Sequence, residues 1–367
     1  MKTRKVKSVA AQLHYIAKDS KVLATMDEKL DTTRYVPTDF PFLNRALVVG
    51  GAPLGCIWAL HGPYGGGKST LAVGICKSFI RQGHFAVYLD AEHAVSRKWF
   101  GQLGLDPDDL LFMRPKTFED ACDEVDRAMN NFSEAKAKHQ IADDAAMVIV
   151  IDSINKLTPK NELKQFKELG AKATEKGGAR YRGLILQAWL DRLTPLVGEQ
   201  DIAMIWIAQE REQQTSQPWE RDWKVKGCQG LLFDAMVQIR VTRNTKLWFG
   251  ADKKKIMGGY QHRVYVFKNK VGYPNEHGAF YVSNGQGEYK IGFVHEKDVI
   301  EEALKRGNAF IERSGAWYSL EGAKYQGEDA LVRALIEEPA LMMRLRNALD
   351  LQVVERSGHD DGDEDAD

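Results

Sequence analysis

A short glycine-rich segment restricts the folds that this chain can adopt: Gly62-Pro63-Tyr64-Gly65-Gly66-Gly67-Lys68-Ser69. It lies between an apolar run at residues 56–60, which is typical of a strand, and apolar residues at helical spacing from Leu71 onward. Glycines at such a junction let successive backbone N–H groups converge on one anion at the helix N-terminus, where the helix dipole also favours negative charge. The segment therefore predicts a phosphate-binding loop in an α/β fold.

Two side chains at the end of this loop predict how a nucleoside triphosphate would be held. Lys68 is expected to span the β- and γ-phosphates, and the Ser69 hydroxyl to ligate Mg²⁺. The residues expected to bind the nucleotide are Gly62, Pro63, Tyr64, Gly65, Gly66, Gly67, Lys68, Ser69 and Thr70.

The composition favours a soluble, cytoplasmic protein. Of the 367 residues, 44% are apolar and 28% are charged. No apolar stretch approaches the roughly 18 residues that a membrane span needs, and no secretory signal is visible. The cysteines are far apart, without zinc-ligand spacing, and are expected to be reduced thiols. They are Cys56, Cys76, Cys122 and Cys228.

Short apolar runs alternate with helical patterns through the middle of the chain. These runs lie at residues 85–89, 110–113, 147–151 and 202–207. Because strands that are buried on both faces read as continuous apolar runs, they predict a mostly parallel central sheet covered by helices. From Ala235 the pattern becomes strand-rich, which predicts an antiparallel extension of this sheet.

These patterns divide the chain into four parts. Residues 1–35 are expected to form a small helical arm, 36–291 the α/β core, 292–354 a small C-terminal α/β domain and 355–367 an acidic, disordered tail. The tail holds seven acids and one base, so the rest of the chain carries 50 bases against 44 acids. The tail either solubilises the protein or competes with polyanions for its basic surface.

Polar side chains follow three of the predicted strands. Asp152 comes directly after residues 148–151 and suits an indirect hold on Mg²⁺, with a helix cap as the alternative. Glu92 follows another strand and is the candidate for activating the attacking water; an ion pair or a solvated loop is the alternative. Gln209 follows a third strand and is either a sensor of the γ-phosphate or a surface amide.

In this order the residues resemble those of the RecA recombinase family, over most of the chain. The resemblance depends on residues 62–70 with the preceding 43–47 and 50–51, on Asp90-Ala91-Glu92-His93-Ala94, and on residues 148–153 followed by 157–160. Lys268-Asn269-Lys270 and Ser314-Gly315-Ala316-Trp317-Tyr318-Ser319 extend it downstream. It implies a RecA-like P-loop NTPase core that uses ATP and Mg²⁺.

The resemblance also implies a helical filament on single-stranded DNA that exchanges strands with a homologous duplex. Glu92 matches the catalytic glutamate of the family. Lys268 and Lys270 match lysines that reach ATP from the neighbouring protomer, where added cations neutralise transition-state charge. The alternative is that they are exposed charges at the end of a strand. Trp99 stands where the family stacks a tyrosine on adenine, with a core residue as the alternative, and Ser96 stands where an aspartate contacts the base. The N-terminal arm would dock on the next protomer.

Two segments match the DNA-binding loops of the family. Residues 160–184 are polar and basic, which suits phosphate contact, although interspersed glutamates also fit a solvated helix face. Residues 210–227 mix tryptophans with cations, which suits base stacking or a protein contact. Phe233 matches a residue that relays between protomers, or is a buried core residue. The expected DNA contacts are Lys172, Lys176, Arg180, Arg182, Trp219, Arg221, Trp223, Lys224 and Lys226.

The sequence thus predicts a DNA-dependent ATPase that forms filaments and catalyses homologous pairing and strand exchange in DNA recombination and repair. The alternatives are a RecA-fold ring helicase and a non-exchanging accessory protein that binds filaments. The acidic tail and the block at residues 315–318 argue against a helicase. The presence of Lys68, Ser69, Glu92 and Asp152 together argues against an accessory protein with a degraded ATP site.

Overall fold

The computed structural model describes residues 34–47, 50–169, 178–214, 221–225, 229–249, 256–287, 289–307 and 311–357. Apart from Arg34, these residues belong to the unit that runs from Tyr35 to the end of the chain. Residues 1–33 of the predicted arm and residues 358–367 of the predicted tail lie outside the described residues. Tyr35, the last residue of the predicted helical arm, instead begins strand β1 (Tyr35–Val36). No helix in the described stretches is long and apolar enough to cross a membrane.

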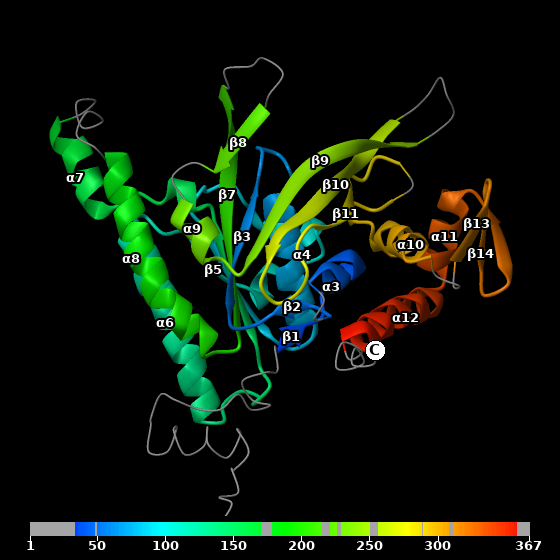
Figure 1. Cartoon of the computed structure of the whole chain (residues 1–367), viewed down its shortest axis with the longest axis horizontal. Helices are drawn as coiled ribbons and strands as arrows, with labels where there is room; N and C mark the ends of the chain where they lie inside the picture. Colours follow the sequence, from blue (N-terminus) through cyan, green and yellow to red (C-terminus); the bar gives the residue numbers. More distant parts are fainter. Residues whose placement is uncertain are drawn as a thin grey trace, which may run out of the picture. The chain divides into compact units, whose positions relative to one another are not determined.

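A ten-stranded sheet forms the centre of the described fold (Figure 1). Its strand order is β12-β11-β10-β9-β3-β7-β6-β4-β5, and β8 pairs with β7 beside this path. A two-stranded sheet of β1 (Tyr35–Val36) and β2 (Ala52–Pro53) precedes it in the chain. The strands of the large sheet are β3 (Cys56–Gly62), β4 (Phe85–Asp90), β5 (Leu111–Met113), β6 (Met147–Asp152), β7 (Ile202–Gln214), β8 (Arg221–Val225), β9 (Val237–Phe249), β10 (Ile256–Asn269), β11 (Glu276–Ser283) and β12 (Gly292–Phe293).

The sheet is parallel from β9 through β3, β7, β6 and β4 to β5. Along the other direction, β9, β10, β11 and β12 pair antiparallel. The predicted class, a mostly parallel sheet with an antiparallel extension, is confirmed. One detail differs: β9 itself runs parallel to β3, so the antiparallel part begins one strand later than expected. Local composition cannot reveal pairing direction, because the chain path between strands sets it.

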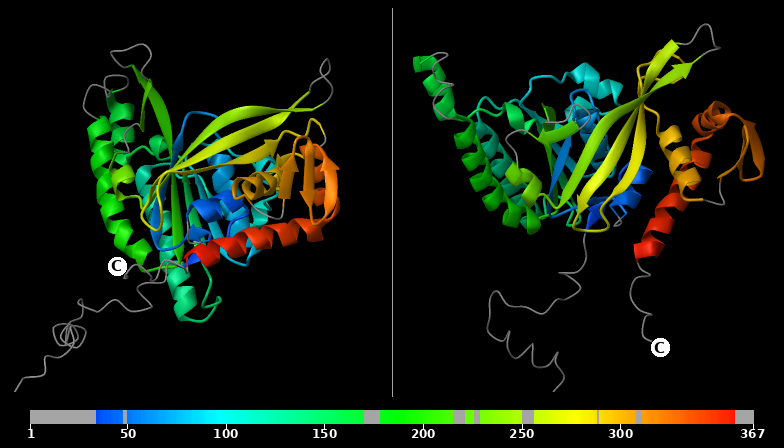
Figure 2. Two further views of the ribbon diagram at one scale, coloured as in Figure 1. Left: turned by 45° about the vertical axis from the view of Figure 1, so that its right-hand side comes forward. Right: turned by 45° about the horizontal axis from the view of Figure 1, so that its top comes forward.

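Helices cover both faces of the sheet, which explains why its central strands are apolar throughout (Figures 1 and 2). Successive residues of β6 point to opposite faces: Val150 belongs to one hydrophobic core and Ile149 to the other. The first core lies against α3 (Pro41–Ala46), α4 (Lys68–Arg81) and α5 (Arg97–Gln102), and the second against α6 (Phe118–Ala137), α8 (Gly178–Gly198) and α9 (Gln229–Asp234).

The residues after β12 surround a third hydrophobic core that includes Val299, Tyr318 and Leu331. The last helix, α12 (Pro339–Ser357), contributes Leu345 to this core and extends three residues into the segment predicted as tail. The other elements of this region are α10 (His295–Lys305), α11 (Glu328–Glu337) and an antiparallel sheet of β13 (Ile311–Ser314), β14 (Trp317–Leu320) and β15 (Ala323–Gln326).

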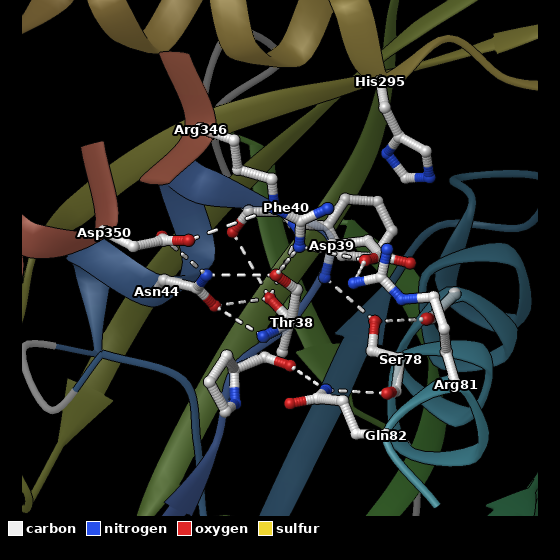
Figure 3. Close-up of polar contacts among 12 residues, drawn as sticks. Thr38, Asp39, Phe40, Asn44, Ser78, Arg81, Gln82, His295, Arg346 and Asp350 are labelled. Atoms are coloured by element: carbon white, nitrogen blue, oxygen red, sulfur yellow. Dashed lines mark hydrogen bonds and ion pairs between the residues drawn. The ribbon is translucent and has the colours of Figure 1, made fainter. Parts of the chain in front are cut away.

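Polar contacts tie α12 to the segment in front of α3 (Figure 3). Arg346 donates to the Thr38 carbonyl at 2.7 Å and to the Asp39 carboxylate at 2.9 Å. Asn44 donates to Asp350 at 3.2 Å. The last helix thus holds the first described residues of the core.

Candidate nucleotide-binding and catalytic site

The carboxyl ends of the parallel strands meet at one edge of the sheet. Gly62 at the end of β3 lies level with Gln209 on β7, and Asp90 at the end of β4 lies level with Asp152 on β6. Because the strand order is β3-β7-β6-β4, these positions are neighbours along that edge. Ligands of open α/β sheets bind at this edge, so the fold brings the candidate residues to one place.

The glycine-rich segment leads from β3 into α4, as its sequence predicts. Gly67 is the N-cap of α4 with a φ of 101°, and it offers no side-chain hydrogen bond to the first turn. Gly62 leaves no room for a side chain, since a Cβ there would lie 2.1 Å from the Val241 carbonyl oxygen. The loop therefore packs against β9 and leaves the start of α4 without a side-chain cap, which suits an anion.

Lys68 is buried and folds over the loop. Its Nζ donates to the carbonyl oxygens of Gly62 at 3.0 Å and Pro63 at 2.8 Å. Burial lowers the pKa of Lys68, while the negative charges of Asp152 and Glu92 act in the opposite direction. A buried cation beside the start of a helix is well suited to hold phosphate groups.

Asp152 lies at the end of β6, below the loop. Its buried carboxylate accepts hydrogen bonds from Ser69 and from the Tyr88 hydroxyl, the latter at 2.6 Å. Burial raises the pKa of Asp152 although both donors act against that change.

The pair of Ser69 and Asp152 fits the way proteins bind Mg²⁺. This ion takes few protein ligands and completes its shell with water and substrate phosphates. The Ser69 hydroxyl could serve as one such ligand, oriented by its hydrogen bond to the Asp152 carboxylate. A bound cation would favour the charged form of Asp152. Within the described stretches, no group of three or more His, Cys, Asp or Glu residues could hold a metal by itself.

Glu92 follows β4 and reaches across to the end of the neighbouring strands. Its Oε1 accepts hydrogen bonds from Ser153 Oγ at 2.7 Å and from Gln209 Nε2 at 2.5 Å. Gln209 is fixed in turn, since its backbone N–H donates to Asn155 Oδ1 at 2.9 Å. The structure therefore brings Glu92 and Gln209 into direct contact and holds the carboxylate with two donors.

Three residues of this cluster were not assigned a role from the sequence: Tyr88, Ser153 and Asn155. Ser153 and Asn155 lie within three residues of Asp152, so their position after a predicted strand was a usable signal. Tyr88 had no such signal, because an aromatic residue inside an apolar strand reads as core. The hydrogen bond that it donates to Asp152 depends on the pairing of β4 with β6.

Within the described part of the chain, the remaining candidates for nucleotide contact make no hydrogen bond with the glycine-rich loop. Lys268 donates to the carbonyl oxygens of Leu232 at 3.2 Å and Phe233 at 2.7 Å, and Lys270 is exposed. Trp99 is half-buried on α5 and packs against the first core. Ser96 caps the same helix by accepting from the Trp99 backbone N–H at 3.2 Å.

The two predicted DNA loops contain more regular structure than expected. The first is helical at both ends, with α7 (Lys160–Leu169) and the start of α8, and Arg182 pairs with Glu162 at 2.5 Å. The second is a β-hairpin in which β7 continues to Gln214 and pairs with β8. Lys172, Lys176, Trp219 and Lys226 lie outside the described residues, as do the side chains of Arg180, Arg221, Trp223 and Lys224.

Comparison with known proteins identifies the family. A sequence model of the RecA N-terminal domain matches residues 7–288. The chain belongs to the RecA family. The matched range includes the glycine-rich loop and its neighbours at the sheet edge, and it ends shortly before β12.

Individual RecA proteins match almost the whole chain. Protein RecA of Bacteroides thetaiotaomicron is 30% identical over 351 residues, which cover 95% of this chain and 97% of that protein. Protein RecA of Syntrophus aciditrophicus is 30% identical over 319 residues, covering 87% and 84%. Protein RecA of Heliobacterium modesticaldum is 31% identical over 315 residues, covering 86% and 82%. This chain is thus a divergent member of the RecA family.

Proposed function

We propose that this RecA-family chain is a DNA-dependent ATPase that assembles filaments on single-stranded DNA and catalyses homologous pairing and strand exchange. The observation that carries the proposal is the contact of Glu92 with Gln209 at the sheet edge that also holds Lys68 and Asp152. Membership of the RecA family supports the proposed DNA binding and strand exchange.

In this proposal the loop and its neighbours bind ATP with Mg²⁺. Backbone N–H groups at the start of α4 and the Lys68 ammonium hold the phosphates. Ser69 would ligate the Mg²⁺ ion, which supplies charge neutralisation on the phosphate oxygens when bound. Asp152 orients the Ser69 hydroxyl through the hydrogen bond that it accepts. Trp99 would stack on the base, as proposed from its place in the sequence.

Glu92 is the proposed general base. Its carboxylate would orient the attacking water and accept a proton at the oxygen that Ser153 and Gln209 leave available. Those two donors restrict the rotation of the carboxylate, which favours one orientation for the proton transfer. Gln209 would change its contacts with the state of the γ-phosphate and so report it.

Strand β7 supports a link between the ATP site and DNA. Gln209 lies on β7, and the same strand continues as the β7–β8 hairpin, where Glu210 pairs with Val225 and Gln214 with Arg221. We propose that this hairpin and the α7–α8 segment contact single-stranded DNA. A shift of Gln209 would move the base of the hairpin, because both belong to one continuous strand.

Assembly is the remaining part of the proposal. Lys268 and Lys270 would act on the ATP of a neighbouring protomer as cations supplied in trans. Phe233 is 77% exposed, which supports a role between protomers better than a place in the core. The N-terminal arm would supply the contact to the next protomer, giving an open, non-closing assembly.

A strand-exchange assay tests the whole proposal. Circular single-stranded DNA and homologous linear duplex are incubated with ATP and either wild type or Lys68→Ala, which is expected to abolish ATP turnover and extended exchange. Glu92→Gln is expected to slow hydrolysis at least about 100-fold while leaving ATP-supported DNA binding intact. Fork unwinding by closed rings would favour the helicase, and filament binding without exchange would favour the accessory protein. Normal hydrolysis by Glu92→Gln would disprove the role of that residue.

A further inference from the structure

The antiparallel strands β9 and β10 form a ribbon beside the glycine-rich loop. Two side chains of this ribbon lie against the loop. Arg243 on β9 and His262 on β10 are paired residues in the register of these strands. The His262 Nδ1 atom lies 2.7 Å from the carbonyl oxygen of Gly66. Because a carbonyl oxygen can only accept, the Nδ1 atom carries the hydrogen and donates it.

The imidazole of His262 is held firmly in this position. It is 6% exposed and stacks on Phe280, with ring centroids 4.9 Å apart and an angle of 14° between the planes. Phe280 is itself fully buried in the first core. A Cβ on Gly67 would lie only 2.4 Å from the His262 Nδ1 atom, so the ring rests directly against the loop.

Arg243 lies against the same loop at Gly65, one residue before the Gly66 carbonyl that His262 contacts. Its guanidinium stacks on the ring of Tyr260 at 4.4 Å from the centroid. A Cβ on Gly65 would lie 2.9 Å from an Arg243 nitrogen. The three successive glycines at 65–67 therefore all meet the ribbon, and two different side chains support the loop from outside.

The hydrogen bond to Gly66 has a consequence for the next residue. In a trans peptide the C=O of one residue and the N–H of the next point in opposite directions within one plane. With the Gly66 carbonyl directed at His262, the Gly67 N–H must point away from the ribbon. That N–H belongs to the N-cap of α4, where an anion is attracted by the start of the helix.

We propose that His262 is a positioning residue for nucleotide binding, which sets the direction of the Gly67 N–H by holding the Gly66 carbonyl. The inference depends on the proposed function, because it assumes that the loop binds ATP. His262 touches no phosphate in this scheme; it acts only through the loop, and Arg243 restricts the same loop beside Gly65.

The test compares His262→Phe with His262→Asn in the full-length protein. Phenylalanine keeps a ring on Phe280 but cannot donate, whereas the asparagine amide can take the place of the Nδ1–H donor. Equilibrium binding of a fluorescent ATP analogue with Mg²⁺ is expected to be about tenfold weaker for His262→Phe and to recover to within about threefold for His262→Asn. KM for ATP should rise by a similar factor while kcat stays within about twofold.

His295→Phe is the matched control. His295 also stacks on a phenylalanine, Phe293, with centroids 5.3 Å apart, but its hydrogen bond goes to Asp298 on its own helix. This variant is expected to change thermal stability without changing the affinity for the ATP analogue. If His262→Phe does not fold, His262→Gln is compared with His262→Met, which have similar volume and of which only glutamine donates.

The outcomes separate the two proposals. Wild-type affinity in the variants that cannot donate, or equal loss in donating and non-donating variants, would overturn the positioning role while the proposed ATPase stands. Failure of the wild type itself to bind the ATP analogue would overturn both.

Discussion

At the scale of one residue, Glu210 shows how ion pairs stabilise the sheet edge that carries the candidate site. It directly follows Gln209, and its buried carboxylate pairs with His61 Nδ1 at 2.7 Å and with Arg240 Nε at 2.9 Å. Burial alone would raise the pKa of Glu210, but the hydrogen bonds and charges of His61 and Arg240 outweigh it and lower the pKa to about 2. Glu210 thus links β7 to His61 on β3 and to Arg240 on β9, directly beside Gln209.

Glu210→Gln is expected to lower the free energy of unfolding by about 3 kcal/mol at pH 7, since one pKa unit corresponds to about 1.36 kcal/mol. The pKa is lower in the folded state than in the unfolded state. The extra free energy of unfolding of wild type over Glu210→Gln is therefore fully present above a pH of about 4.5, and it is lost as the pH falls towards about 2. Urea unfolding at several pH values measures it.

The control for this experiment is Glu312→Gln, because Glu312 is an exposed carboxylate on β13. It is expected to change stability by less than about 0.5 kcal/mol. A pH-independent difference between wild type and Glu210→Gln would show that the carboxylate charge is not what stabilises this edge.

At the scale of elements, the strands were the most predictable part of the molecule. Residues 85–89, 147–151 and 202–207 form β4, β6 and part of β7, because apolar runs of that length suit strands buried on both faces. The glycine-rich loop predicts which edge of the sheet holds the site. Glu92, which follows β4, and Gln209, which lies within the longer strand β7, meet at that edge.

The elements around this edge were less predictable. The ends of the segment at 160–184 are helical because its charged residues also have helical spacing, an alternative that composition alone left open. His262 is 196 residues from Gly66 in the sequence, so its contact depends on the register of β9 and β10. No local pattern contains such information.

The β7–β8 hairpin carries a prediction about single-stranded DNA. Trp223→Ala is expected to weaken the affinity for a labelled oligonucleotide about tenfold, because stacking of one base contributes roughly 1–3 kcal/mol. Fluorescence anisotropy at fixed salt measures this affinity. Trp317→Ala, which removes a half-exposed indole from β14, is the control and should leave it unchanged. If both Trp219→Ala and Trp223→Ala bind like wild type, the hairpin indoles contact protein instead.

At the scale of the whole molecule, the proposed role of Lys268 and Lys270 would make ATP turnover depend on contact between neighbouring protomers. In the single protomer Lys268 holds two carbonyl oxygens at the end of α9, and burial together with the nearby Lys270 lowers its pKa. A lysine that serves a neighbour must leave these partners. If the two lysines act in trans as proposed, hydrolysis requires contact between protomers rather than a complete set of residues within one.

Mixing two inactive variants tests this dependence. Lys268→Ala/Lys270→Ala and Glu92→Gln are each expected to lose DNA-stimulated ATPase activity. In a 1:1 mixture, random assembly pairs an intact glutamate with intact lysines at about a quarter of the contacts, so about a quarter of wild-type activity should return. A mixture as inactive as its components would show that the lysines act within their own protomer.

The bonds between α12 and the start of the core also determine when this protein can complete its structure during translation. Thr38 and Asp39 leave the ribosome early, but Arg346, which binds both, is made more than 300 positions later. Domains generally fold as units while the chain is synthesised from its N-terminal end. The start of the core therefore reaches its final contacts only after residue 346 has been made, and a nascent polypeptide that stalls before that residue lacks the ion pair between Arg346 and Asp39.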